Sequence, residues 1–263
     1  MNDTDVWIIS IGNELLMGKV VNTNATWLSR KLTSFGFNVK RIIVIPDDEN
    51  EIIEVIRDAL KRAKVIICTG GLGPTFDDKT SEALAKALDR EWILNDDAFK
   101  ELSLKLKKKG MELTRERLKM AYLPRGARPL FNPVGIAPGL LIEVNNKLII
   151  ALPGVPAEME AMFEESVTKI LLKKFPLKYF KERSLVVAKV PESATVPIIS
   201  KLMEKYKGAY IKSLVKGGES GYPILEFYIT YVGEKAELVE GILTELVKEL
   251  KEELVKLGGE ELY

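Results

Sequence analysis

Residues 65–80 read VIICTGGLGPTFDDKT, and this stretch decides the fold. The apolar run Val65–Thr69 predicts a strand that is buried on both faces. The three glycines and the proline that follow predict a loop, and a helix is expected from about Asp78 to Leu88. Strand, glycine-rich loop and helix in this order are typical of the edge of an α/β sheet where ligands bind.

Similar strand–helix units surround this stretch. Helical spacing of apolar residues predicts helices after the first two apolar runs, and a further helix is expected from Pro156 to about Lys174. Alternation of this kind predicts an α/β fold, a three-layer domain with a mostly parallel sheet. The remaining predicted strands are Val6–Ile11, Val39–Ile45, Leu140–Val144 and Lys147–Leu152, the last two forming a hairpin around Asn145-Asn146.

A second, smaller domain is expected beyond a linker at Pro176–Arg183. The order of predicted elements there is βαββα, which indicates a small α+β domain, so the domains are expected at 1–176 and 177–263. The tetrad Gly218-Glu219-Ser220-Gly221 matches the GxxG loop of KH domains, but it joins two predicted strands and carries an acid. From Leu177 onward 13 basic residues face 14 acidic ones, so no nucleic-acid partner is expected. The elements concerned are strands at Leu185–Val190, Ala209–Val215 and Ile224–Val232 and helices at Val196–Tyr206 and Ala236–Leu257.

Composition limits the protein class. The 263 residues are 46% hydrophobic, enough for a large core, and 39 Lys+Arg against 38 Asp+Glu exclude nucleic-acid binding by bulk charge. No apolar run is long enough for a membrane span and no signal peptide is visible, so a cytoplasmic protein without a membrane partner is expected. Abundant Lys and Glu with no Gln are typical of thermophiles.

The missing residue types limit the chemistry further. With no His, the chain has no Ser-His-Asp triad, no His base and no His metal ligand. Cys68 is the one cysteine and cannot form a disulfide within the chain or a cysteine-rich zinc site, so it is expected to be a small buried strand residue. Any divalent metal would therefore be held by oxygen ligands, which favours Mg²⁺, Mn²⁺ or Co²⁺.

Three loops follow predicted strands and should meet at one sheet edge. They are Gly12-Asn13-Glu14, Thr69–Asp78 and Pro153–Pro156. In the second loop, glycines let backbone N–H groups approach a phosphate, and Asp77 and Asp78 can hold a bridging cation. The alternative is a tight turn in which one of these aspartates caps the helix.

Residues in and near the other two loops can also be explained by structural roles instead of ligand binding. Asn22 and Asn24 can bind a nucleobase or ribose, but helix capping is the preferred interpretation for both. Pro156 fits the first position of a helix, and Glu158 fits its first turn. Arg117 and Lys119 can supply charge to a phosphate, or form a solvated helix face.

These motifs together resemble the N-terminal region of the CinA family of competence- and damage-inducible proteins. The matching segments are Gly12–Leu16 with Asn22–Asn24, Thr69–Thr75 with Asp77, Asp78 and Thr80, Asn132–Gly135 with Ala137–Gly139, and Leu152–Pro156 with Glu158. That region is related to the molybdopterin-binding domains of molybdenum-cofactor synthesis, and the tail resembles the KH-like domain that follows it. At Glu116-Arg117-Leu118-Lys119 the family tends towards Asn-Arg-x-Gln. Because the chain stops at Tyr263, the nicotinamide-mononucleotide deamidase domain of longer CinA proteins and its activity are expected to be absent.

The resemblance implies metal-dependent hydrolysis of a nucleotide diphosphate, ADP-ribose to AMP and ribose 5-phosphate above all, by a homo-oligomer. Glu14, Asp77 and Asp78 would be the catalytic residues and the metal ligands. Two alternatives stay open: binding or adenylylation of a molybdopterin-type substrate, and a non-catalytic nucleotide sensor. The expected substrate-binding residues are Asn13, Asn22, Asn24, Thr69, Gly70, Gly71, Gly73, Thr75, Thr80, Arg117, Asn132, Gly135, Gly139, Pro153, Gly154, Val155 and Glu158.

Overall fold

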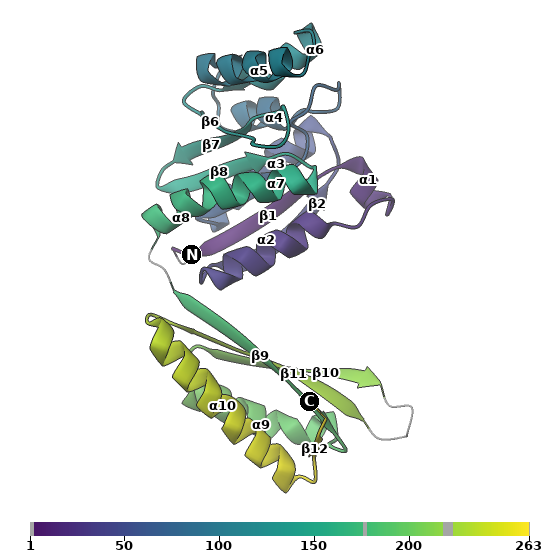
Figure 1. The fold of residues 1–263 in the computed structure, drawn as a ribbon, viewed down its shortest axis with the longest axis vertical. Coiled ribbons are helices and arrows are strands. Elements are labelled where there is room, and N and C mark those ends of the chain that lie inside the picture. The colour runs from purple at the N-terminus through teal and green to yellow at the C-terminus, as the bar shows by residue number, and fades with distance from the viewer. Residues whose placement is uncertain (1–2, 176–177, 218–222, 263) are drawn as a thin grey trace. The chain divides into compact units, whose positions relative to one another are not determined.

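The computed structural model describes residues 3–175, 178–217 and 223–262, shown as a ribbon in Figure 1. It divides into two compact units. Unit 1 comprises residues 1–33 and 37–176, and unit 2 comprises residues 34–36 and 177–263. None of the helices in the described ranges combines the length and the apolar composition that a membrane span requires.

Unit 1 is built on a six-stranded sheet with the order β2-β1-β3-β8-β7-β6. Its first four strands in this order run parallel, whereas β7 and β6 pair antiparallel with their neighbours. The prediction of a mostly parallel sheet is confirmed. The strands are β1 (Asp5–Ile11), β2 (Asn38–Ile45), β3 (Val65–Thr69), β6 (Arg128–Leu130), β7 (Gly139–Val144) and β8 (Lys147–Leu152), and a separate pair is formed by β4 (Trp92–Leu94) and β5 (Tyr122–Pro124).

Helices cover both faces of this sheet and make three layers (Figure 1). Trp7, Ile9 and Ile11 of β1 pack into one core with residues of α3 (Glu49–Arg62) and α4 (Thr80–Ala87). The alternate residues Val6 and Ile8 are equally buried and point to the opposite face, because successive strand residues alternate. On that second face lie α2 (Thr23–Ser34), α7 (Pro156–Met162) and α8 (Thr168–Lys174), while the remaining helices are α1 (Asn13–Leu16), α5 (Asp96–Lys108), α6 (Arg115–Leu118) and a 3₁₀ turn at Lys119–Ala121.

Two local predictions in unit 1, a hairpin turn and a helix, can be compared with the structure. Asn145 and Asn146 both have positive φ, 47° and 62°, as a two-residue hairpin turn between β7 and β8 requires. The helix expected from Pro156 to Lys174 is present, but it passes through a π-helical segment at Phe163–Val167 between α7 and α8.

Unit 2 is a four-stranded antiparallel sheet, order β10-β11-β9-β12, packed against two helices. The predicted βαββα order is confirmed, with β12 as an added edge strand. Leu185, Phe227 and Leu246 belong to the single core that joins the sheet to both helices. The predicted GxxG tetrad at 218–221 lies outside the described residues. The elements are β9 (Tyr179–Ala188), α9 (Glu192–Lys205), β10 (Ala209–Gly217), β11 (Ile224–Gly233), α10 (Ala236–Lys256) and β12 (Glu260–Glu261).

The predicted linker at Pro176–Arg183 is wrong where it can be checked. Tyr179–Arg183 forms the first half of β9 and pairs with β11, while residues 176–177 lie outside the described residues. Lys181 and Arg183 of this half both contact the carboxylate of Glu240 in α10. A polar run that looks like a linker is therefore a strand stabilised by a partner strand and a helix distant in sequence.

Candidate functional site

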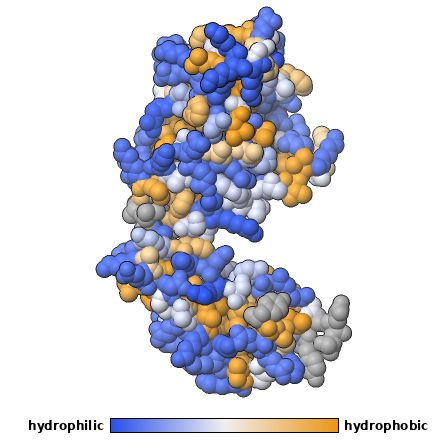
Figure 2. Space-filling model, in the orientation of Figure 1, coloured by the Kyte–Doolittle hydropathy of each residue, from blue (hydrophilic) through white to orange (hydrophobic). Residues whose placement is uncertain are grey.

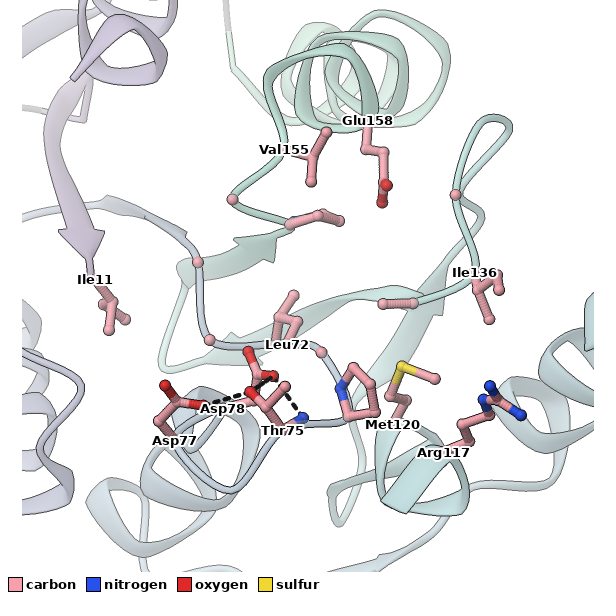
Figure 3. Close-up of a pocket in the computed structure, with 18 of the residues that line it drawn as sticks. Ile11, Leu72, Thr75, Asp77, Asp78, Arg117, Met120, Ile136, Val155 and Glu158 are labelled. Carbon is pink, nitrogen blue, oxygen red and sulfur yellow. Dashed lines mark hydrogen bonds between the residues drawn. The ribbon is translucent and has the colours of Figure 1, made fainter. Parts of the chain in front are cut away.

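A cleft of about 610 Å³ lies where β1, β2, β3 and β8 end. The three loops that the sequence placed at one edge meet here, joined by residues 135–137 and by Arg117 and Met120. Figure 3 shows Asp77 and Asp78 at one end, Arg117 at the other, and Val155 and Glu158 on the facing wall. The expected site residues that line the cleft are Glu14, Gly70, Gly71, Gly73, Thr75, Asp77, Asp78, Arg117, Gly135, Pro153, Gly154, Val155 and Glu158.

The glycine-rich loop depends on backbone conformations that side chains disfavour. Gly70 and Gly71 have φ of 100° and 66°. A Cβ on Gly70 would collide with the carbonyl oxygen of Ile11, and one on Gly71 with the hydroxyl of Thr80. That hydroxyl donates to the Gly70 carbonyl at 2.9 Å, so Thr80 fixes the loop from beneath and does not line the cleft. Small residues here let the loop lie directly against the end of β1.

Backbone donors of two loops are left without partners. In the described part of the chain, no hydrogen bond uses the N–H of Gly71, Leu72, Gly73, Gly154 or Val155. All five residues line the cleft. Backbone N–H groups are strong donors that are normally paired, and successive free ones form an anion-binding concavity.

The two aspartates fold back onto Thr75. The Thr75 N–H and hydroxyl both donate to Asp78 Oδ2, at 2.9 and 2.6 Å, and the hydroxyl also contacts Asp77 Oδ1. The Thr75 hydroxyl holds the pKa of Asp77 below its usual value. The capping alternative is wrong, because α4 begins after Lys79 with no side-chain cap.

Lys119 braces this turn from a distant segment. Its ammonium donates to the carbonyl oxygens of Thr75 and of Asp78, the latter at 2.9 Å. The same positive charge contributes to the lowered pKa of Asp77. Lys119 therefore holds the loop rather than facing a phosphate directly, at the position where the CinA family tends towards Gln.

Asp47, which the sequence did not single out, completes an acidic end of the cleft. Burial raises the pKa of its half-buried carboxyl, and Glu14, Asp77 and Asp78 raise it further, against a hydrogen bond from the Asn13 N–H. That bond measures 2.8 Å and holds the loop after β1, which is the role of Asn13. Asp47 follows β2 directly, so applying the rule of strand carboxyl ends to this strand would have found it.

The facing wall is organised by Asn132. Its Nδ2 donates to the Glu158 carboxylate at 2.7 Å and to the Ala137 carbonyl at 2.8 Å, and its Oδ1 accepts from the Gly135 N–H. A Cβ on Gly135 would collide with Glu158. Asn132 thus supports the wall from a buried position, and Gly139 lies in β7 against Ala151, outside the cleft.

A smaller cavity of about 70 Å³ adjoins the cleft and shares Ile11, Glu14 and Gly154 with it. Asn22, Asn24 and Thr69 line this cavity. Asn22 caps α2, since its Oδ1 accepts from the Ala25 N–H at 3.1 Å. For Asn24 the capping interpretation is wrong: its Nδ2 donates to the Gly154 carbonyl at 2.8 Å and so ties α2 to the loop after β8.

Apolar side chains lie beside this cavity. Leu16, Met17, Val20 and Val21 are 53 to 80% exposed. They form the apolar surface over α1 and the segment after it in Figure 2, and Val20 and Val21 line the small cavity.

The carboxylates do not form a ready metal cage. Across the residues that the structure describes, no group of three or more acidic or cysteine side chains is placed to hold a metal ion by itself. Mg²⁺ in phosphate sites is commonly held by one or two carboxylates together with substrate phosphates.

Comparison with known proteins identifies the family of unit 1. The family model described as "Probable molybdopterin binding domain" matches residues 7–173. The chain belongs to the molybdopterin-binding domain family. A crystal structure of the protein CinA, of unknown function, from Thermoplasma acidophilum is 43% identical, covers 64% of this chain and 99% of that chain, and has a TM-score of 0.61. The resemblance to CinA is thereby confirmed.

Relatives of the full chain are found as well. A protein of Pyrobaculum aerophilum is 49% identical over 251 residues, 95% of this chain and 94% of that protein. A protein of Metallosphaera sedula is 45% identical over 253 residues, 96% of this chain and 95% of its own. The molybdopterin-binding domain and unit 2 are thus found together in other archaeal chains.

Proposed function

We propose that the cleft binds a ligand of the molybdopterin or nucleotide type through its phosphate groups. The observation that carries this proposal is the set of free N–H groups on the loops 71–73 and 154–155, which line one cleft. The family description supports the same ligand class. Arg117, at the end of the cleft opposite the aspartates, adds a positive charge for a second anionic group (Figure 3).

The binding proposal is tested by calorimetry with pyrophosphate in the presence of Mg²⁺. Wild-type protein should bind, and Gly154→Ala should bind at least tenfold more weakly, because a methyl group enters the cradle. At this position a Cβ lies 3.4 Å from the Gly70 Cα, an ordinary contact, so the variant should fold normally. Wild-type affinity in Gly154→Ala would contradict the proposal.

Metal-assisted hydrolysis of ADP-ribose is a second candidate, favoured by the four carboxylates at one end of the cleft. Glu14, Asp77 and Asp78 would hold a divalent cation, which when bound neutralises phosphate charge and lowers the pKa of water. Without His, a carboxylate has to accept the proton of the attacking water, and Asp47 and Glu14 are both placed at this end.

This candidate is tested by AMP release from ADP-ribose with Mg²⁺, Mn²⁺ or Co²⁺ and with chelator. Metal-dependent release that falls on the order of 100-fold in Asp78→Ala would establish it. No release from folded protein that still binds pyrophosphate would leave a binding domain without this activity.

A further inference from the structure

A second cavity in unit 1, of about 590 Å³, shares Pro74 and Thr75 with the cleft. All its other lining residues are absent from the cleft, and we call it the rear cavity. Its volume is in the range of sites that hold small organic ligands. The phosphate-binding loops do not use it, so its lining has to be explained separately.

Aromatic side chains form part of this lining. The rings of Trp92 and Tyr122 lie 5.1 Å apart between centroids and are tilted by 48°. Trp92 Nε1 donates to the Tyr122 carbonyl oxygen at 2.9 Å, which fixes the indole. Phe76, which also lines the cavity, is 90% exposed. A planar ring bound between the fixed indole and Phe76 would remove apolar surface from water on both sides.

Three of the four charged side chains in the lining are already paired. Glu82 forms an ion pair with Lys86 at 2.9 Å. Glu116 accepts a hydrogen bond from the Thr114 hydroxyl, which lowers the pKa of its carboxyl, as do the nearby charges of Arg115 and Arg117. The Lys119 ammonium donates to the two carbonyl oxygens described above. These groups are therefore committed to the protein itself.

Arg115 is the fourth charged side chain of the lining. Within the part of the chain that the structure describes, its exposed guanidinium makes no hydrogen bond and no ion pair. A guanidinium binds a carboxylate through two parallel hydrogen bonds. The rear cavity thus combines aromatic rings with one uncommitted cation, which together match an aromatic ring that carries a carboxylate.

We propose that the rear cavity is a second ligand site for an aromatic carboxylate, and that its occupancy is coupled to the cleft. The ring of the ligand lies against Trp92 and Tyr122, Phe76 covers its outer face, and the carboxylate pairs with Arg115. The coupling rests on the proposed function of the cleft, whereas the second site does not.

The wall between the two cavities carries the coupling. Thr75 lines both cavities and accepts a hydrogen bond at its carbonyl from Lys119 of the rear cavity. In α6, Arg115 lines the rear cavity and Arg117 the cleft, because residues two apart lie on different sides of a helix. A ligand that orders this wall from one side lowers the cost of ordering it from the other. An aromatic carboxylate should therefore tighten pyrophosphate binding, and pyrophosphate should tighten binding of the carboxylate.

NMR of nitrogen-15-labelled protein tests the site with 2-naphthoate as the probe. Saturable shifts of the Trp92 indole N–H and the Phe76 amide are expected. Two matched compounds, 2-naphthylmethanol without the charge and cyclohexanecarboxylate without the aromatic ring, should bind at least tenfold more weakly. No saturable shift of either signal overturns the site, and equal affinity for either matched compound overturns its assignment to an aromatic carboxylate.

Substitution of the cation tests the same assignment from the side of the protein. Arg115→Met should weaken 2-naphthoate binding about tenfold and leave the affinity for 2-naphthylmethanol unchanged. Arg30→Met is the matched control, since Arg30 is an exposed arginine of α2 that lines neither cavity. Wild-type affinity for 2-naphthoate in Arg115→Met, or an equal loss in both variants, contradicts the proposal.

Calorimetry tests the coupling separately. With saturating 2-naphthoate, pyrophosphate and Mg²⁺ should bind about fivefold more tightly. Unchanged pyrophosphate affinity overturns the coupling alone, and failure of pyrophosphate to bind while 2-naphthoate still binds overturns the proposed function and leaves the second site.

Light scattering tests the other occupant of this surface, a second copy of the chain. Phe76→Ser should weaken 2-naphthoate binding and leave the molar mass unchanged. A wild-type protein that does not bind 2-naphthoate but self-associates, with the association lost in Phe76→Ser, would assign the surface to a second copy and overturn the proposal.

Discussion

Glu240 and Glu249 of unit 2 and Asp47 at the acidic end of the cleft have different electrostatic surroundings. In unit 2, Glu240 pairs with Arg183 and Lys181, and Glu249 contacts Lys205 and Tyr206; these partners hold the pKa of both glutamates below its usual value. In the cleft of unit 1, burial and three neighbouring acids raise the pKa of Asp47. Like charges brought together oppose folding, and proteins keep such groups where a ligand compensates them. Glu240 and Glu249 are therefore paired within unit 2, while the cleft keeps acids and free N–H groups for a ligand.

The largest expected effect is a loss of stability in unit 2 that leaves ligand binding in unit 1 unchanged. Phe227 is fully buried in the unit 2 core, and Phe227→Ala should lower the free energy of unfolding by about 3–5 kcal/mol, because it leaves a cavity. Urea unfolding measures the loss. Pyrophosphate affinity should stay unchanged below the transition, and a parallel loss of affinity would break the division of roles between the units.

Lys119 supports the acidic end of the cleft by donating hydrogen bonds to backbone carbonyl oxygens. Lys119→Met should weaken pyrophosphate binding about tenfold, roughly 1.4 kcal/mol, because the Thr75–Asp78 turn loses its brace. It should also raise the pKa of Asp77, followed by carbon-13 NMR of its carboxyl. Lys119→Arg keeps the donors and serves as the control. An unchanged pKa and affinity in the Met variant would show that the brace has no role.

The sequence predicted the parallel sheet and the meeting of its loops because both follow from local patterns. Buried strands are apolar throughout, and the loops after parallel strands share an edge. The β9 strand was missed because Lys181 and Arg183 find their partner, Glu240, on a helix far along the chain. The Asn24 bond to Gly154 was missed for the same reason, since the two residues are 130 positions apart in the sequence.

A smaller effect is expected at a glycine of unit 2, which differs from the glycines of the cleft loop. Gly241 lies in α10, exposed, with open space where a Cβ would stand, whereas the glycines of the cleft loop have no such space. Gly241→Ala should raise the free energy of unfolding by about 0.5–1 kcal/mol, through helix propensity and a less flexible unfolded chain. Thermal unfolding monitored by circular dichroism measures the gain. A destabilised variant would show that this helix face has a contact beyond the chain itself.

The smallest expected effect is a change in stability on removing one carboxylate, Asp47, from the acidic end of the cleft. Because the pKa of Asp47 is raised above 3.8 in the folded protein, its contribution to stability is complete below that pH and is lost as pH rises through the folded value. Asp47→Asn should therefore stabilise the protein near neutral pH, by a few tenths of a kcal/mol after solvent screening. At about pH 3 the variant and the wild type should melt alike. Destabilisation near neutral pH would contradict the like-charge account.

The central claim is that free backbone N–H groups of two loops bind phosphate. Its most direct test is amide NMR of nitrogen-15-labelled protein titrated with pyrophosphate and Mg²⁺. The largest shifts should fall on Gly71, Leu72, Gly73, Gly154 and Val155, with the amides of unit 2 unmoved. Saturable shifts that spare these five amides, or no shifts at all, would contradict the account.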